Sequence, residues 1–260
     1  MSREWNSAEY ARLSNPQLAW GLRVLDQLEL RGDERVLDAG CGSGRVTTEL
    51  LQRLPRGRLI ALDLSFNMAA SAATALGKFA PRIGVVQADL LELPLATASL
   101  DVVFSTAVFH WVRDHDRLFA EIFRALRPGG RLHAQCGGGQ NLARLRERAL
   151  AIMSTPRFAP FFVGWSEPWE YPDAPTTAER LRRAGFADIE AGLHAAPTSL
   201  PNARDFQDFQ ATVTLHRHLA RLPNELRTEL LLSLAAQYAK DDPPFTLDYW
   251  RLDLRGRKPE

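Results

Sequence analysis

Apolar residues in the first half of the chain alternate between short continuous runs and stretches with helical spacing. Leu18, Leu22, Leu25 and Leu28 recur at the spacing of one helix face, which predicts a helix over residues 17–30. The predicted strands cover residues 35–39, 58–63, 83–87, 100–105 and 131–135, and the helices between them cover 45–54, 66–79 and 116–126. Apolar strands that alternate with helices form a parallel sheet covered on both faces, which is an α/β fold.

The second half of the chain interrupts this pattern twice. Residues 140–172 begin as a helix and then carry many aromatic residues and prolines, and residues 203–240 indicate two further helices. The sheet pattern resumes with a helix at 177–184, a strand at 189–195 and a last strand at 246–254. Because no internal repeat is present, we interpret residues 1–260 as one domain whose two insertions lie over one end of the sheet.

The segment VLDAGCGSG, residues 36–44, places three glycines between a buried strand and a helix. Glycines let the chain turn sharply there, and a ligand can reach backbone N–H groups because no Cβ intervenes. Gly40, Gly42 and Gly44, with Cys41 among them, are therefore candidate cofactor contacts. Similar loops occur in nicotinamide and flavin enzymes, and a plain tight turn also explains the pattern.

An aspartate stands near the carboxyl end of each of the first three predicted strands: Asp38, Asp63 and Asp89. A buried Asp38 needs a cation or a strong hydrogen-bond donor, and the ammonium group of S-adenosylmethionine would supply one, whereas a pyrophosphate would be repelled. Asp63 can accept hydrogen bonds from ribose hydroxyls, and Asp89 can accept one from an adenine amino group. A helix cap explains any single aspartate equally well, but three at successive strand ends favour a nucleoside ligand.

Five segments in this order resemble the class I S-adenosylmethionine-dependent methyltransferases: VLDAGCGSG, ALDLS, QADLLELP, SLDVVFSTAVFHWV and LRPGG. The resemblance implies a Rossmann-like, seven-stranded, mostly parallel sheet whose last strand is antiparallel, with helices on both faces and helical lid insertions. It implies S-adenosyl-L-methionine as cofactor, with contacts from Asp38, Gly40, Asp63, Leu64, Asp89, Leu90 and the backbone of Ser105. We also expect Met68 to pack with Leu64 and Leu90 against the adenine ring. The segment AVFHWVRDHDRLFAEI is similar to a subgroup that includes trans-aconitate and juvenile hormone acid methyltransferases, which esterify carboxylates.

His110 and Trp111 follow the fourth strand, near the expected switch in strand order, where open α/β sheets bind ligands. We expect Trp111 to be a pocket wall, and His110 to be either a general base or a structural residue. The N-terminal segment, residues 1–30, resembles the lid of this subgroup, which implies that Trp5 and Tyr10 cover the cofactor or the acceptor; a surface aromatic pair before a helix explains these residues equally well. The insertions 140–172 and 203–240 would cap the substrate. The His216-Arg217-His218 run could bind an acidic acceptor, but we interpret it as a solvated helix face.

Composition narrows the possible partners. Lysine plus arginine total 32 against 31 acidic residues, so a net charge of +1 provides no field to hold nucleic acid or an acidic membrane surface. The chain begins without a targeting pattern, no run approaches the ~20 apolar residues of a membrane span, and Cys41 and Cys136 form no disulfide framework. We therefore predict a cytoplasmic enzyme with a small-molecule acceptor and no metal site; the oligomeric state is not determined by these features.

The predicted reaction is O-methylation of a small carboxylate. Displacement from a sulfonium depends on alignment and water exclusion, and a carboxylate nucleophile needs no base. A phenol acceptor usually needs a base to remove its proton, and His110 is the candidate for that base. Three alternatives remain open: methylation of a phenolic oxygen, nitrogen or carbon, cofactor binding without catalysis, and a nicotinamide dehydrogenase.

Overall fold

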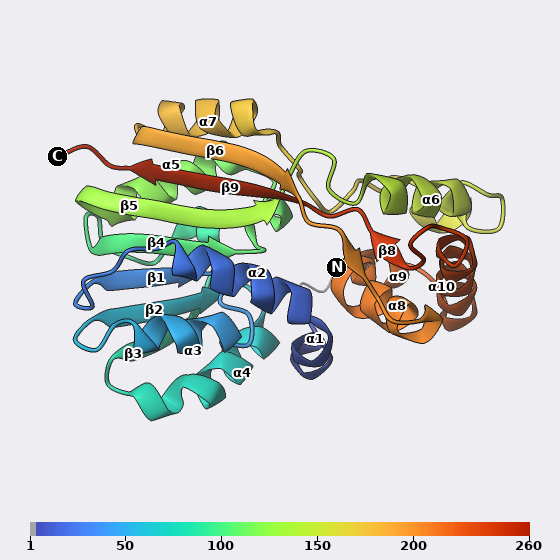
Figure 1. Cartoon of the computed structure of the whole chain (residues 1–260), viewed down its shortest axis with the longest axis horizontal. Coiled ribbons are helices and arrows are strands. Elements are labelled where there is room, and N and C mark those ends of the chain that lie inside the picture. The colour runs from blue at the N-terminus through green and yellow to red at the C-terminus, as the bar shows by residue number, and fades with distance from the viewer. Residues whose placement is uncertain (1–3) are drawn as a thin grey trace.

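A seven-stranded sheet in the order β3-β2-β1-β4-β5-β9-β6 forms the centre of the computed structural model, which describes residues 4–260 (Figure 1). Its strands are β1 Arg35–Ala39, β2 Arg58–Asp63, β3 Ile83–Gln87, β4 Leu100–Thr106, β5 Leu126–Gly137, β6 Ala187–Ala195 and β9 Trp250–Arg257. Strands β1 to β5 pair in parallel, and β9 runs antiparallel between β5 and β6. The mostly parallel sheet with an antiparallel last strand is therefore confirmed.

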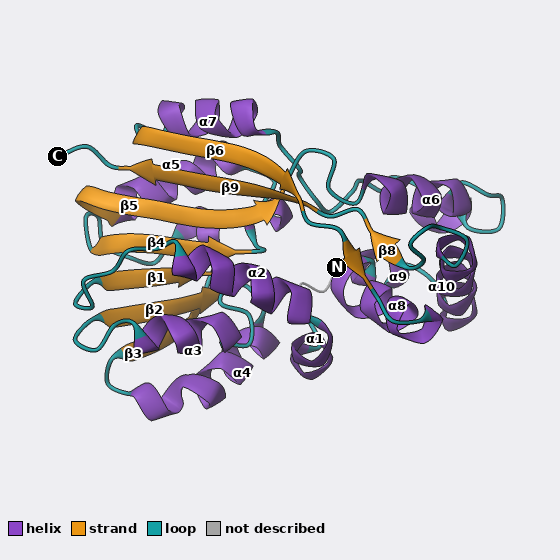
Figure 2. Cartoon of the chain, in the orientation of Figure 1, coloured by secondary structure: helices purple, strands orange, loops and turns teal. Residues whose placement is uncertain are grey.

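Helices cover both faces of this sheet (Figure 2). One face carries α2 Asn15–Asp26, α3 Arg45–Gln52 and α4 Phe66–Leu76, and the other carries α5 His115–Ala125 and α7 Ala174–Arg183. Since successive strand residues point to opposite faces, the central strands β1, β2 and β4 contribute to the apolar clusters on both faces. Val36 and Val102 pack with the first group of helices, whereas Leu37 and Val103 pack with the second.

A third apolar cluster lies beyond the carboxyl ends of the strands, on the right in Figure 1. It joins α6 Ala143–Met153 to α8 Ala203–Phe209, the π-helical turn η5 Gln210–Thr214, α9 His216–Leu219 and α10 Asn224–Tyr238. We call this group the outer helical layer. Its members come from both interruptions of the sheet pattern, so segments distant in sequence share one core. The N-terminal helix α1 Ser7–Leu13 packs between this layer and α4.

Several predicted boundaries change. The strand expected at 246–254 is two strands, because β8 Thr246–Leu247 pairs with β7 Thr198–Ser199 in a separate small sheet and β9 begins at Trp250. Residues 203–240 contain α8, η5, α9 and α10 rather than two helices. In residues 4–260, no helix has both the length and the apolar character needed to cross a bilayer.

Candidate functional site

Three adjoining pockets open at the carboxyl ends of the central strands. The strand-end pocket contains about 810 Å³ of atom-free space and lies against the ends of β1, β2 and β4. Ten residues proposed from the sequence line it: Trp5, Tyr10, Gly40, Gly42, Asp63, Leu64, Met68, Asp89, Leu90 and Trp111. The glycine-loop pocket continues it past Gly40 and Gly42 toward Asp38 and Cys41. The aromatic pocket lies on the other side of Tyr10 and Ala107 and contains His110.

Gly40 and Gly42 play different parts in the glycine loop. Gly40 has φ of +85°, and a Cβ there would stand 2.2 Å from a methyl group of Val108 in the segment after β4. At Gly42, by contrast, a Cβ would meet nothing within 4 Å. Gly40 thus permits close packing of the chain against itself, whereas Gly42 leaves open space that a ligand can occupy.

Asp63 is held rigidly at the end of β2. The backbone N–H of Gly42 donates to Oδ2 and the N–H of Ser65 donates to Oδ1, both at 2.9 Å. Burial raises the pKa of Asp63, and the two N–H donors oppose that rise. Each carboxylate oxygen keeps a second lone pair, so the side chain can accept hydrogen bonds from a vicinal diol in the strand-end pocket.

Asp38 is the most deeply buried carboxylate of the site, only 2% exposed. Its Oδ2 accepts a 2.6 Å hydrogen bond from the Thr47 hydroxyl, and desolvation raises its pKa to about 7. Arg45 also lines the glycine-loop pocket, but its guanidinium donates to the Ala11 carbonyl and to Asn15. Within residues 4–260 no cation forms an ion pair with Asp38, so this carboxylate is a candidate receptor for a positively charged ligand group.

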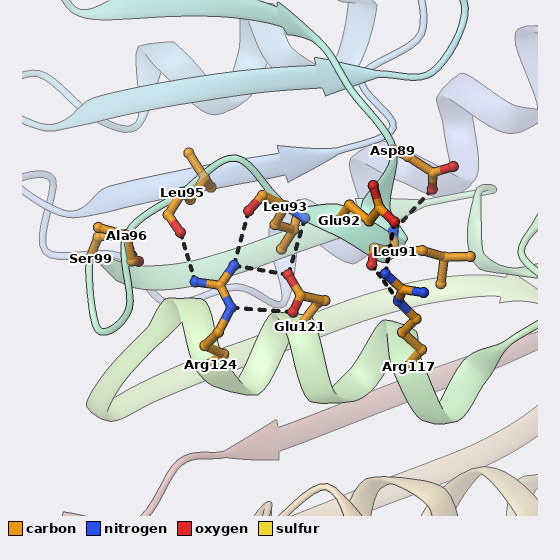
Figure 3. Close-up of polar contacts among 10 residues, drawn as sticks. All are labelled: Asp89, Leu91, Glu92, Leu93, Leu95, Ala96, Ser99, Arg117, Glu121 and Arg124. Atoms are coloured by element: carbon orange, nitrogen blue, oxygen red, sulfur yellow. Dashed lines mark hydrogen bonds and ion pairs between the residues drawn. The ribbon is translucent and has the colours of Figure 1, made fainter.

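The segment after β3 positions Asp89 and Leu90. Asp89 accepts from the N–H of Leu91 at 3.0 Å and caps the short turn η2 Leu90–Glu92. Figure 3 shows how α5 holds this segment: Arg124 donates to the carbonyls of Leu93 and Leu95 at 2.9 and 2.8 Å, and Arg117 donates to the Leu91 carbonyl at 2.8 Å. This wall of the strand-end pocket is therefore fixed by arginines that stand outside the pocket.

His110 lies in the turn η3 Phe109–Trp111 and lines the aromatic pocket, 8% exposed. Its Nδ1 accepts a hydrogen bond from the backbone N–H of Gly137 at 3.2 Å, so a neutral ring carries its proton on Nε2. Burial, together with the charge of Arg251, lowers the pKa of His110 well below its usual value. The ring is therefore a neutral hydrogen-bond donor toward the pocket, and its basic lone pair is already used.

Arg251 on β9 supplies a positive charge to the same pocket. The side chain is 2% exposed, its Nε donates to Gln135 Oε1 at 3.2 Å, and its guanidinium lies 4.5 Å from the Trp20 ring centroid. Its Nη2 has no hydrogen-bond partner, and in the described part of the chain it forms no ion pair. A buried guanidinium with an unsatisfied nitrogen, in a residue that lines a cavity, is a candidate binding site for an anion.

Other sequence-proposed residues lie elsewhere. Gly44 begins α3 and packs against α4 without lining a pocket, and Ser105 is buried with its hydroxyl donating to the Ala39 carbonyl. The interpretation of His216 and His218 as a solvated helix face is wrong: the His216 ring lies 3.9 Å from that of Trp5, and His218 is 1% exposed and paired with Glu167. α9 is enclosed because the N-terminal segment and the loop before α7 pack on it.

Sequence reasoning missed Gln17, Thr106, Ala107, Tyr249 and Arg251 as pocket residues. Arg251 alternates with Leu252 along β9, which is typical of a strand with one solvated face. On the same face of β9, Asp253 and Arg255 stay partly exposed, whereas Arg251 is buried, with its guanidinium against Trp20 of α2. The local sequence pattern does not separate Arg251 from these two neighbours, so it offered no signal.

Comparisons with known proteins agree with this geometry. A profile described as methyltransferase domain matches residues 37–134. The chain is 30% identical to trans-aconitate 2-methyltransferase of Deinococcus radiodurans over 226 residues, which cover 84% of this chain and 83% of that protein. It is 34% identical over 142 residues to malonyl-acyl-carrier-protein O-methyltransferase of Xylella fastidiosa, covering 54% of this chain and 48% of the relative, so that match spans about half of the relative's length.

Solved structures share the fold at lower identity. Phosphoethanolamine N-methyltransferase 2 of Haemonchus contortus superposes with a TM-score of 0.60 at 21% identity, covering 93% of this chain and 53% of that chain. The cyclase SpnF superposes with a TM-score of 0.62, also at 21% identity, covering 93% and 81%. An N-methyltransferase and a cyclase on one fold illustrate that the chemistry has to be argued from the site.

Proposed function

Because this chain belongs to the class I S-adenosylmethionine-dependent methyltransferases, in the subgroup of the trans-aconitate enzymes, we propose that it esterifies a small carboxylic acid. The acid would bind in the aromatic pocket and the cofactor in the two pockets beside it. The observation that carries the proposal is the buried Arg251: its Nη2 has no hydrogen-bond partner, and the residue lines a pocket that no carboxylate of the described chain lines.

When bound, S-adenosylmethionine supplies a methyl group on a positively charged sulfur. The described residues fit this cofactor: Asp38 would receive the ammonium group, and Asp63 would accept from the ribose hydroxyls. Asp89 would accept from the adenine amino group, with the apolar side chains of Leu64, Met68 and Leu90 against the ring. Gly40, Cys41 and Gly42 would face the cofactor from the loop, and Trp5 and Tyr10 from the lid.

The acceptor side favours a carboxylate over a phenol. Arg251 would bind a negatively charged acceptor directly, and the Nε2–H of His110 would donate a second hydrogen bond to it. A phenol would require a base, but the Nδ1 lone pair of His110 accepts from Gly137 and the low pKa of the ring makes it a poor proton acceptor. Trp111 and Trp169 would exclude water, and we propose that the outer helical layer acts as the substrate cap.

The test is product chemistry. The purified protein is incubated with S-adenosylmethionine and separate panels of small carboxylic acids, phenols and amines. We expect methylated product only from acids, and this product should release methanol in mild base because it is an ester. A base-stable ether or amine product would contradict the proposal, and binding of S-adenosylhomocysteine without any turnover would identify a non-catalytic protein.

The proposed role of His110 predicts different effects for two substitutions. His110→Gln keeps an N–H near the position of Nε2 and should retain activity within about tenfold. His110→Phe removes the donor and should lower kcat/KM for the acid about 100-fold. The measurement is kcat/KM at saturating cofactor from pH 6 to 9, where we expect no inflection from His110. An inflection that disappears in both variants, together with their activity, would instead identify a general base.

Arg124→Ala should weaken cofactor binding although Arg124 does not line the pocket. The change removes two hydrogen bonds to the segment that carries Asp89 and Leu90. We expect about a tenfold rise in the Kd of S-adenosylhomocysteine, measured by calorimetry. Arg183→Ala is the matched control, because Arg183 pairs with Asp116 on the same side of the sheet without touching that segment. Equal effects of both variants would indicate a general loss of stability.

A further inference from the structure

The aromatic pocket provides positive charge for one anionic group. Among residues 4–260, Arg251 is the one cationic side chain that lines it, and His110 is neutral there. The remaining polar liners are the amides of Gln17 and Asn141 and the hydroxyls of threonine and tyrosine side chains. These neutral groups can hydrogen-bond to an acceptor but do not balance a second buried carboxylate, which would remain an unpaired charge.

Four aromatic rings that lie close to one another line the same pocket. Trp169 and Tyr171 stack with ring centroids 5.8 Å apart and planes at 18°, and the His110 ring lies 5.7 Å from Tyr171 at 30°. Trp111 lies 6.0 Å from Trp169. The pocket contains about 370 Å³ of atom-free space, compared with about 810 Å³ in the strand-end pocket. Its shape and lining suit a small, flat, apolar body.

Nearby charges do not supply a second anion site. Arg217 lines the strand-end pocket, with its guanidinium 5.1 Å from the Trp111 ring centroid, and does not line the aromatic pocket. Arg146 lies 5.5 Å from the Tyr171 ring centroid and is also absent from the lining. Asp38 faces the adjoining glycine-loop pocket, so its carboxylate adds a negative potential beside the acceptor.

From these observations we infer that the acceptor is a monocarboxylic acid with a flat apolar body, and that di- and tricarboxylates are rejected. Arg251 binds the single carboxylate, and the rings of Trp111, Trp169 and Tyr171 surround the apolar part. This inference rests on the proposed function and adds the substrate class to it. It differs from the trans-aconitate acceptor named for the relative of Deinococcus radiodurans.

The experiment compares acids that differ by one charge. Ester formation is measured at pH 8 and saturating S-adenosylmethionine for hexanoate against adipate and for trans-cinnamate against 4-carboxycinnamate. We expect kcat/KM of each monoacid to exceed that of its diacid by about 100-fold or more, because the second carboxylate is buried without a partner. Monomethyl adipate controls for size, since it has the length of adipate without the second charge. It should react much faster than adipate.

The outcomes separate this inference from the proposed function. Equal or faster methylation of adipate or trans-aconitate would overturn the inference and leave the proposed function standing. Rejection of monomethyl adipate as strong as that of adipate would also overturn it, because the pocket would then select acceptors by their size and not by their charge. If no acid of either kind is methylated, the proposed function itself is wrong.

Two variants test for a second anion site directly. In Arg217→Gln and Arg146→Gln the ratio of monoacid to diacid kcat/KM should be unchanged, whatever their overall rate. A loss confined to diacids in either variant would show that this arginine binds a second carboxylate and would overturn the inference.

Discussion

Arg251→Met is expected to lower kcat/KM for the carboxylic acid acceptor by about 1000-fold while the Kd of S-adenosylhomocysteine changes by less than about threefold. The reason is that Arg251 provides the positive charge of the aromatic pocket and does not line either cofactor pocket. Loss of a charged partner from a buried site costs 3–5 kcal/mol, about 1000-fold at the middle of that range. Calorimetry and steady-state kinetics on the same preparation measure both quantities.

The variant should fold, which keeps the result interpretable. Burial lowers the pKa of Arg251, a sign that its charge is costly where it stands, and Met can keep the apolar contact with Trp20. We therefore expect Tm at or above that of the parent protein. Arg251→Lys keeps a charge but loses the planar fork and the bond from Nε to Gln135, and should show an intermediate rate. Full activity of Arg251→Met on acids would refute the assigned role.

Asp38→Asn is expected to raise the Tm of the cofactor-free protein by about 2–5 °C at pH 8 and to weaken S-adenosylhomocysteine binding about 100-fold. Burial raises the folded-state pKa of Asp38 to about 7, above the unfolded value of about 4. The folded protein thus holds this proton more tightly. The stabilisation that this proton gives to the folded state is complete below about pH 4 and is lost as the pH rises through 7. The gain in Tm should accordingly disappear at pH 4, as a thermal-unfolding series would show.

The same titration makes cofactor affinity depend on pH. A cationic ammonium group binds the ionised form of Asp38, so affinity should fall below pH 7, where the carboxyl is protonated. Asp38→Asn should lose the component with a midpoint near pH 7. Thr47→Val is the matched control: it removes the hydrogen bond that opposes the raised pKa and should move the midpoint upward. A midpoint unchanged in both variants would assign the titration to another group.

The glycine loop and the three strand-end aspartates could be located from sequence because their signals are local. Asp38 follows an apolar run directly, and Gly40 and Gly42 follow within the same turn, so backbone geometry alone brings them to the strand ends. Parallel pairing then aligns the end of β1 with those of β2 and β4. Predicting the residues of the strand-end pocket therefore required no long-range information beyond the order of the strands.

The acceptor side could not be located in the same way. Arg251 reaches the aromatic pocket because β9 is inserted between β5 and β6, far from its neighbours in sequence. The tautomer of His110 depends on a hydrogen bond from Gly137 on β5, and the enclosure of His216 depends on Trp5 from the opposite end of the chain. In each case the partner that sets the chemistry is more than 25 residues away.

Hydrophobic period and turn residues act over a few positions, so the sheet, its covering helices and the cofactor-facing strand ends could be predicted from the sequence. The polar groups of the aromatic pocket and their protonation states, by contrast, depend on the packed chain. Burial and hydrogen-bond partners are properties of the packed chain, and they make Arg251 an anion site and His110 a neutral donor.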